Sequence, residues 1–242
     1  LMYALLMGNG RRVLTMTMMG TSNKIVVQQE EFVDMYPKFL RNRVYVIPNP
    51  VDNVKFVSNL QPTADGFYEI LYVGRLEPFQ KRVDFLLRAF VDIAQDFPNW
   101  RLRFVGDGMI GQLISDCIKE FDLSRQIIVS ETVKDVGYYY ASASLFVMPS
   151  RWEGFPNSLL EALSHGLPAI TFDDSSGVST LVRESGGWVV DSQGGVQGLA
   201  RTLEKAMEDR DELLLRSSKA RAYAQSRSKT GGINDWLEVM DI

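Results

Sequence analysis

Two glutamates, Glu153 and Glu161, lie on either side of the predicted start of a helix. An apolar strand at Leu145–Val147 leads into this segment, and Asn157 and Ser158 can cap the helix or bond to a ligand. The first-turn amides of a helix form an anion site, because the helix dipole adds partial positive charge there. Carboxylates accept paired hydrogen bonds from neighbouring hydroxyls such as those of sugars. The segment therefore predicts a site for a ligand with phosphate and hydroxyl groups; the simpler alternative is a capped helix with Glu161 facing water.

Basic residues follow an earlier strand candidate, which ends at Val73. Gly74-Arg75-Leu76-Glu77 comes directly after it, and Lys81 and Arg82 stand where the next helix is predicted to begin. Arg binds phosphate through parallel hydrogen bonds and Lys binds it as a point charge, so this loop can clamp a phosphate. The alternative is a solvated helix start. That alternative is weakened because cations at a helix N-terminus are unfavourable unless an anion lies near.

A third loop spells G-x-G-x-x-G at Gly106–Gly111, between a strand and a helix, and Glu131 follows at the end of the next strand. This pattern is typical of dinucleotide-binding domains, where glycines let the backbone approach a pyrophosphate. Three strand candidates precede it, however, whereas the dinucleotide fingerprint lies on a domain's first strand–helix turn. We therefore favour a tight glycine-lined turn that can line a ligand pocket over the dinucleotide alternative.

The composition of the 242-residue chain excludes several classes of site. Its formal net charge of −4 argues against nucleic acid as a main partner, because phosphate backbones favour a basic surface. Cys117 is the single cysteine, which excludes an internal disulfide and a cysteine-based zinc site. His165 is the single histidine, so no cluster of histidines can hold a metal. We interpret His165 as a packing residue and predict neither a metal site nor a cofactor.

Apolar strand-like runs alternate with amphipathic helical runs from about residue 24 onward. Several strand candidates lack polar alternation, as strands buried on both faces do. The alternation predicts an α/β fold with a doubly wound, Rossmann-like parallel sheet and helices on both faces. The predicted strands are Lys24–Gln28, Val44–Ile47, Tyr68–Val73, Arg101–Val105, Ile127–Val129, Ser144–Val147, Ala169–Phe172 and Trp188–Val190.

Pro48-Asn49-Pro50 cannot continue a strand ladder, because proline has no amide hydrogen. Residues 53–67 then lack periodicity and are predicted to form a connection. The two strand candidates before Pro48 are too few to bury a core of their own. We predict a remnant of an N-terminal domain at 1–47, a main domain at 48–226, and a C-terminal helix at 227–242 that can pack on the remnant. Because the chain begins at Leu1, we expect it to be part of a longer protein.

The segment Glu153-Gly154-Phe155-Pro156-Asn157-Ser158-Leu159-Leu160-Glu161 resembles the E-x7-E signature of group 1 (family 4) glycosyltransferases. Three further pieces agree with this family in order and spacing: Pro48-Asn49-Pro50-Val51-Asp52, Gly74-Arg75-Leu76 with Lys81, and Val105-Gly106-Asp107-Gly108. The match covers roughly residues 24–190. The resemblance implies the GT-B fold, in which two Rossmann-like domains face each other across a cleft. It further implies that the C-terminal half binds a sugar nucleoside diphosphate.

The resemblance also implies roles for individual residues. Arg75, Lys81 and Glu153 are the implied catalytic residues: the two cations would contact the diphosphate, and Glu153 would hold donor-sugar hydroxyls. Glu161 would hold the ribose hydroxyls. The remaining implied donor-binding residues surround the diphosphate or lie near the base; they are Gly74, Gly106, Gly108, Gly154, Phe155, Pro156, Asn157 and Ser158.

The implied activity is transfer of a hexose-type sugar, with retention and without a metal, to a glycan or lipid-linked acceptor. The resemblance implies a role in cell-surface polysaccharide synthesis, in the cytoplasm at the inner face of the membrane, with membrane contact through an N-terminal domain. The family's acceptor site belongs to that domain, so the alternative is a nucleotide-sugar-binding module that is inactive without it. A phosphorylase or epimerase on the same fold is a weaker alternative, because no pyridoxal lysine is identified. Asp173–Val178 departs from the family's glycine-bearing loop, so we assign it no sugar contact.

Overall fold

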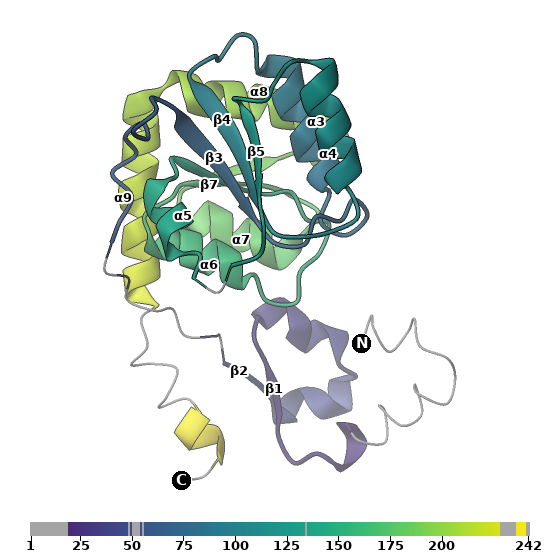
Figure 1. Ribbon diagram of the computed structural model, residues 1–242. Coiled ribbons are helices and arrows are strands. Elements are labelled where there is room, and N and C mark those ends of the chain that lie inside the picture. The colour runs from purple at the N-terminus through teal and green to yellow at the C-terminus, as the bar shows by residue number, and fades with distance from the viewer. Residues whose placement is uncertain are drawn as a thin grey trace. The chain divides into compact units, whose positions relative to one another are not determined.

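The computed structural model describes residues 19–47, 49, 54, 56–133, 135–227 and 236–240 (Figure 1). The chain separates into two compact units, Leu1–Pro50 with Ser228–Ile242 and Val51–Arg227. Four residues of the Pro48–Asp52 motif, namely Pro48, Pro50, Val51 and Asp52, lie outside the described residues, as do Asn53 and Lys55 of the predicted connection. Among the helices in the described part of the chain, none has the length and apolar character that a bilayer span requires.

The smaller unit contains a pair of parallel strands. Its described elements are β1 (Ile25–Val27), the 3-10 helices η1 (Glu30–Met35) and η2 (Lys38–Arg43), and β2 (Val44–Val46). Residues 236–240 are helical, and the Lys24 ammonium donates to the Val239 carbonyl oxygen at 2.8 Å. The assignment of this unit to an acceptor domain stays a prediction.

The larger unit is built on a six-stranded parallel sheet with the strand order β5-β4-β3-β6-β7-β8. The neighbouring interior strands β6 and β7 are buried at every position, which explains why their sequences show no polar alternation. The predicted strands of this unit are therefore confirmed, with ends that differ by one residue at most. They are β3 (Tyr68–Val73), β4 (Trp100–Val105), β5 (Ile127–Ser130), β6 (Leu145–Met148), β7 (Ala169–Phe172) and β8 (Trp188–Val190).

Helices connect successive strands, and right-handed crossovers place them on both faces of the sheet. In Figure 1, α3 and α4 lie together on one side of the sheet, and α5, α6 and α7 gather on the other. Helix α8 packs on α3, and α9 packs on α6. The helices are α3 (Val83–Ile93), α4 (Gly111–Glu120), α5 (Gly137–Ser142), α6 (Asn157–Ser164), α7 (Ser176–Glu184), α8 (Gly195–Glu208) and α9 (Arg210–Ser226).

The spacing of Leu199, Leu203 and Met207 predicts a long C-terminal helical stretch. The structure divides that stretch at Asp209 into α8 and α9. The Asp209 carboxylate accepts a hydrogen bond from the Glu212 amide at 2.9 Å and so caps the start of α9. Residues Ala220–Ser226 are mostly polar, but they continue α9. Ala220 and Ala224 are buried on the inner face of this segment.

Two helix starts also differ in detail. Helix α3 begins at Val83, two residues after the predicted start, because Arg82 takes a left-handed conformation with φ 48° and ends the preceding turn. In α4, the apolar residues that recur at steps of three and four, from Leu113 to Phe121, are only partly buried. Ile114 is fully buried, whereas Leu113 and Phe121 are exposed, which is typical of a helix at the margin of a sheet.

Candidate functional site

The strand order places two loops at the centre of the carboxyl edge of the sheet. From β3 the chain adds β4 and β5 on one side, and it then crosses back to add β6, β7 and β8 on the other. Ligands of open α/β sheets bind outside the carboxyl ends of the strands, where the strand order reverses. In this sheet, that position lies between residues 74–82, which follow β3, and residues 149–156, which follow β6.

These two loops are joined by backbone and side-chain contacts. The Arg151 amide donates to the Gln80 carbonyl oxygen at 2.8 Å, and the Gln80 side-chain amide donates to the Trp152 carbonyl oxygen at 3.1 Å. The rings of Phe79 and Trp152 meet edge to face with centroids 5.5 Å apart. No sequence signal identifies Gln80, because its partners lie on a loop that is distant in the chain.

Lys81 and Glu153 form an ion pair across the same two loops. The Lys81 ammonium donates to both carboxylate oxygens of Glu153 at 2.7 Å. The exposed fractions of these side chains are 17% and 8%, so water screens the pair only weakly. Burial and the negative charge of Glu153 raise the pKa of the nearby Tyr72 phenol, which donates to the Arg75 carbonyl oxygen at 2.8 Å. The structure therefore brings together two of the predicted catalytic residues.

Glu77 shapes the turn that presents Lys81. Its carboxylate accepts hydrogen bonds from the backbone amides of Phe79, Gln80 and Lys81. Desolvation acts to raise the pKa of Glu77, but these three hydrogen bonds lower it below its ordinary value. The third predicted catalytic residue, Arg75, has a different partner: its guanidinium donates to the Gln80 side chain at 3.3 Å.

Arg82, the neighbour of Lys81, has a different environment. Its guanidinium is buried, forms an ion pair with both carboxylate oxygens of Asp174, and lies over the rings of Phe85 and Phe172. The unfavourable cation at the start of α3 is thus compensated by an anion from the protein itself. The sequence grouped Arg82 with Lys81, whereas the structure points them to separate partners.

The loops after β3 and β4 approach each other through backbone atoms. A Cβ atom on Gly106 would lie 2.0 Å from the Gly74 carbonyl oxygen, and one on Gly108 would lie 2.3 Å from the Leu76 carbonyl oxygen. Only glycine permits these approaches. Beside them is a cavity of about 570 Å³, lined by Gly74, Arg75, Gly106, Gly108, Thr132 and Val133 among others. The Thr132 hydroxyl donates to the Asp107 carboxylate at 2.6 Å and joins two walls of this cavity.

The dinucleotide alternative for Gly106–Gly111 lacks its structural context. This loop follows β4, the second strand of the sheet, instead of the first. The third glycine of the fingerprint allows close packing of helix on strand, but a Cβ atom on Gly111 would meet no atom within 4 Å. Glu131 is exposed. The favoured interpretation, a glycine-lined turn beside a cavity, agrees with this geometry.

Helix α6 starts at the same edge, and the predicted phosphate cradle lies in its first turn and the loop before it. Pro156 is the N-cap residue, and no side chain caps the helix. The Asn157 amide donates to the Phe155 carbonyl oxygen at 3.0 Å, so this amide is directed back into the loop. A Cβ atom on Gly154 would meet no atom within 4 Å, so close packing does not explain this glycine.

Glu161 lies one turn further along α6 and has different neighbours from Glu153. Its residue is exposed, and its carboxylate accepts a hydrogen bond from the Tyr140 hydroxyl at 2.9 Å. The alternative of a glutamate that merely faces water is therefore incomplete, because a buried tyrosine on α5 holds the carboxylate. No local sequence signal identifies Tyr140, since its contact depends on how α5 and α6 pack.

Within the described residues, no group of three or more His, Cys, Asp or Glu side chains is placed to hold a metal ion. The charged groups at the carboxyl edge are instead arranged as a cation–carboxylate pair. With backbone amides at the start of α6 and a cavity beside Arg75, this edge can bind an anionic ligand that also carries hydroxyl groups.

Comparisons with known proteins agree with this description. A family model for "Glycosyl transferases group 1" matches residues 56–227. The chain is 28% identical over 221 residues to an uncharacterised glycosyltransferase of Haemophilus influenzae, covering 91% of the chain and 62% of that protein. It is 31% identical over 179 residues to the amylovoran biosynthesis glycosyltransferase AmsD of Erwinia amylovora, covering 72% of the chain and 50% of that protein. The chain thus spans less than two thirds of each of these relatives.

Solved structures share the fold at lower identity. The S. aureus protein TarM, in a structure with fondaparinux, α-GlcNAc-glycerol and UDP, gives a TM-score of 0.79 at 18% identity, over 92% of this chain and 45% of that one. The pneumococcal O-GlcNAc transferase GtfA, in a structure with UDP and GlcNAc, gives 0.73 at 19% identity, over 90% of this chain and 45% of that one. These similarities show that the chain has the fold of one half of a GT-B glycosyltransferase.

Proposed function

The chain belongs to the group 1 glycosyl transferases, and on that premise we propose that its larger unit binds the nucleoside-diphosphate-sugar donor of a retaining sugar transfer. The observation that carries this proposal is the Lys81–Glu153 pair, which joins the two loops at the reversal of strand order. A cation and a carboxylate at one point suit a ligand in which a phosphate and a sugar hydroxyl are adjacent.

Lys81 and Arg75 are proposed to stabilise the departing diphosphate. When the bond between the sugar and the β-phosphate breaks, negative charge develops on the phosphate, and preorganised donors lower the energy of that state. The loss of one donor of this kind costs about 2.7–4 kcal/mol in transition-state energy. An ammonium has three hydrogens to donate, so Lys81 can bind a phosphate oxygen while it keeps a bond to Glu153.

Glu153 and Glu161 are proposed to bind hydroxyls at two places along the donor. Glu153 would accept bonds from donor-sugar hydroxyls, because it lies beside the proposed phosphate site. Glu161 would accept bonds from the ribose hydroxyls, and the cavity beside Gly106 and Gly108 would take the base. The backbone from Gly154 to Ser158 would complete the phosphate cradle at the start of α6.

The proposal extends to the class of reaction and its place in the cell. We propose transfer with retention to a glycan or lipid-linked acceptor, in cell-surface polysaccharide synthesis at the cytoplasmic face of a membrane, without a metal or cofactor. The relative AmsD, named for amylovoran biosynthesis, supports this class of product. Bound UDP in the TarM and GtfA structures supports a nucleoside diphosphate as the common part of the ligand.

Calorimetry with UDP, GDP and ADP, alone and as sugar conjugates, tests the donor-binding proposal. We expect one base to bind best, and the sugar conjugate to bind with an additional contribution. Glu161→Ala should weaken binding of the nucleoside diphosphate itself, whereas Glu153→Ala should weaken only the part that depends on the sugar. Equal losses from both variants would contradict the assigned roles, and failure of every nucleotide to bind folded protein at millimolar concentration would refute donor binding.

Turnover is tested separately from binding. Incubation with the sugar conjugate and a candidate glycan acceptor, followed by NMR of the anomeric proton of the product, distinguishes retention from inversion. Binding without any product would favour the alternative of a module that needs an N-terminal domain for activity. An inverted product would contradict the retaining mechanism and leave the donor-binding proposal unaffected.

A further inference from the structure

Tyr140 is a buried tyrosine with its hydroxyl at the edge of the proposed ribose site. Its residue is 1% exposed, and its hydroxyl donates to the Glu161 carboxylate at 2.9 Å. Burial, with the negative charge of Glu161 and the hydrogen bond to it, raises the pKa of the Tyr140 phenol far above its ordinary value. Tyr140 therefore stays protonated and remains a donor to Glu161.

The Tyr140 ring is fixed by its neighbours. It stacks on the imidazole of His165, with centroids 5.4 Å apart and planes inclined by 26°, and it contacts the Phe146 ring at 6.0 Å. His165 is the C-cap residue of α6, the same helix that carries Glu161. Tyr140 thus spans the last turn of α6, because its ring stacks on His165 and its hydroxyl bonds to Glu161.

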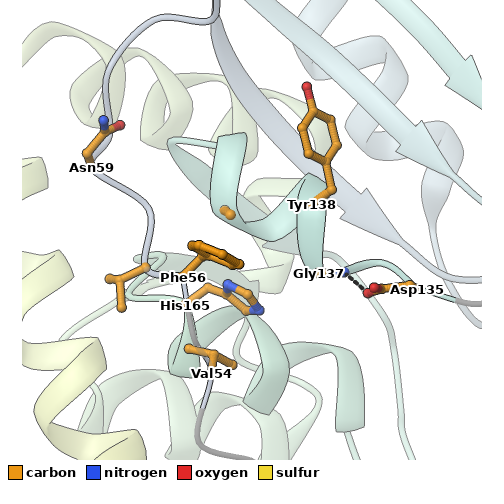
Figure 2. Close-up of a pocket in the computed structure, with 9 residues that line it drawn as sticks. Val54, Phe56, Asn59, Asp135, Gly137, Tyr138 and His165 are labelled. Atoms are coloured by element: carbon orange, nitrogen blue, oxygen red, sulfur yellow. Dashed lines mark hydrogen bonds between the residues drawn. The ribbon is translucent and has the colours of Figure 1, made fainter.

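The environment of His165 favours an uncharged imidazole, on which the Tyr140 ring packs. It lines a cavity of about 700 Å³ together with Phe56, Gly137 and Tyr138, and Figure 2 shows the Phe56 ring close to the imidazole. Burial lowers the pKa of His165, while a hydrogen bond with the Phe56 backbone acts in the opposite direction. In the described part of the chain the His165 Nδ1 atom is buried without a hydrogen-bond partner. An uncharged imidazole fits this environment.

Fixing Glu161 has an energetic consequence for ligand binding. An exposed glutamate loses side-chain rotamer freedom when it binds a ligand, and each immobilised side chain of this kind costs about 0.5–1.5 kcal/mol. A carboxylate already held by a protein donor loses less. A carboxylate offers about four acceptor positions, so a bond from Tyr140 is compatible with bonds from ligand hydroxyls.

We propose that Tyr140 is a positioning residue that fixes the Glu161 carboxylate for the ribose hydroxyls of the donor. Helix α5 also connects the site to the base cavity, because Val136, its N-cap residue, lines that cavity. The inference rests on the proposed function, since it takes Glu161 to be the residue that binds ribose.

The test compares ribose-containing ligands with ligands that lack the hydroxyls. Calorimetry would use the tightest binder among UDP, GDP and ADP, and its 2′,3′-dideoxy analogue, with wild-type protein and Tyr140→Phe. We expect Tyr140→Phe to weaken the ribose form by about 2- to 12-fold and to leave the dideoxy form unchanged. Equal losses for both forms, or no loss for either, would overturn the proposal, because a merely structural tyrosine would not distinguish the two ligands.

Matched variants separate this inference from the function on which it rests. Tyr138→Phe removes a hydroxyl from the same helix at a residue that is 77% exposed, and should leave both affinities unchanged. In a Glu161→Ala background, Tyr140→Phe should have no further effect on the ribose form, because its target is gone. If Glu161→Ala weakens the ribose form while Tyr140→Phe does not, only the positioning role fails. If Glu161→Ala itself has no effect, the ribose assignment fails and the inference fails with it.

Discussion

The larger unit contains two buried clusters, each of which pairs a carboxylate with basic side chains, and the two are built differently. Glu69 pairs with Arg101 at 2.6 Å and with Arg103 at 2.7 Å, with exposed side-chain fractions of 2%, 7% and 16%. Glu69 and Arg101 are direct partners in the register of β3 and β4, so the sheet itself sets their positions. Lys81 and Glu153 are about as buried, but both come from loops at the carboxyl edge.

The comparison shows that burial and ion pairing alone do not identify a functional charge. In the cluster of Glu69, Arg101 and Arg103, which we call the strand cluster, each Arg has a second acceptor on the protein. Arg101 donates to Asp65, and Arg103 donates to Ser130. The cluster therefore uses its charges internally. The Lys81–Glu153 pair, which we call the loop pair, lies where ligands of this fold bind. Its ammonium has a third hydrogen that it can donate to a ligand. We infer that the first cluster contributes to stability and the second to binding, and four predictions test that division.

The largest expected effect is on stability, from the strand cluster. Glu69→Gln leaves two buried guanidinium groups without their shared counter-ion, and should lower the free energy of unfolding by about 3–5 kcal/mol. Urea unfolding followed by circular dichroism measures this change. Nucleotide affinity of the folded variant should stay within about twofold of wild type. Glu120→Gln, at an exposed position on α4, is the control and should change stability by less than about 0.5 kcal/mol.

The next effect is on binding, from the loop pair. Lys81→Met should weaken nucleoside diphosphate binding by about 1.5–3 kcal/mol, because it removes a charged hydrogen bond to phosphate. At a nucleotide concentration 100 times the wild-type Kd, wild type and Glu69→Gln should each gain about 2.7 kcal/mol of stability from the ligand, and Lys81→Met only about 0.3–1.3 kcal/mol. Thermal or urea unfolding with and without nucleotide gives these gains. Equal gains in the two variants would remove the distinction between the clusters.

A smaller effect is expected from the contacts that hold the two loops together. Gln80→Ala removes the bond to the Trp152 carbonyl oxygen and the bond from the Arg75 guanidinium. It should cost about 0.5–1.5 kcal/mol of nucleotide affinity, because Arg75 and the loop that carries Glu153 become less well positioned. The exposed Gln112, whose side chain bonds within α4 to Asp116, provides the control variant Gln112→Ala. An unchanged affinity in Gln80→Ala would show that Lys81 and Glu153 hold the loops without this contact.

The smallest effect concerns pH and returns to the strand cluster. Hydrogen bonds from Thr63 and Arg101 lower the pKa of Asp65 to about 2. Because the folded-state pKa lies below the unfolded value, Asp65 contributes stability above the unfolded pKa, and that contribution is lost as pH falls toward 2. Asp65→Asn should therefore flatten the acid side of a plot of urea midpoint against pH between about 4 and 2. Lys81→Met should leave the shape of that acid side unchanged.

Much of the fold is predictable from the sequence because the signals are local. Apolar runs, several of them without polar alternation, identified the strands of the larger sheet, and the β3 and β7 boundaries are as predicted. The break between α8 and α9 was not predicted, because the helical pattern continues on both sides of it. Asp209, a residue type that commonly caps a helix start, was its one local signal. The start of α3 was placed early, because nothing local shows that Arg82 takes a left-handed conformation.

The sequence alone determined the family, and it predicted where the site lies. That prediction named the loops with Arg75, Lys81 and Glu153 and the helix with Glu161, because motif spacing and periodicity are properties of neighbouring residues. Tertiary structure decided the partners. Lys81 meets Glu153 across 72 positions, whereas Arg82 beside it turns to Asp174, and Glu161 meets Tyr140 from another helix. These pairings follow from the strand order and from the packing of α5 on α6, which depend on contacts throughout the folded chain and on no single segment of it.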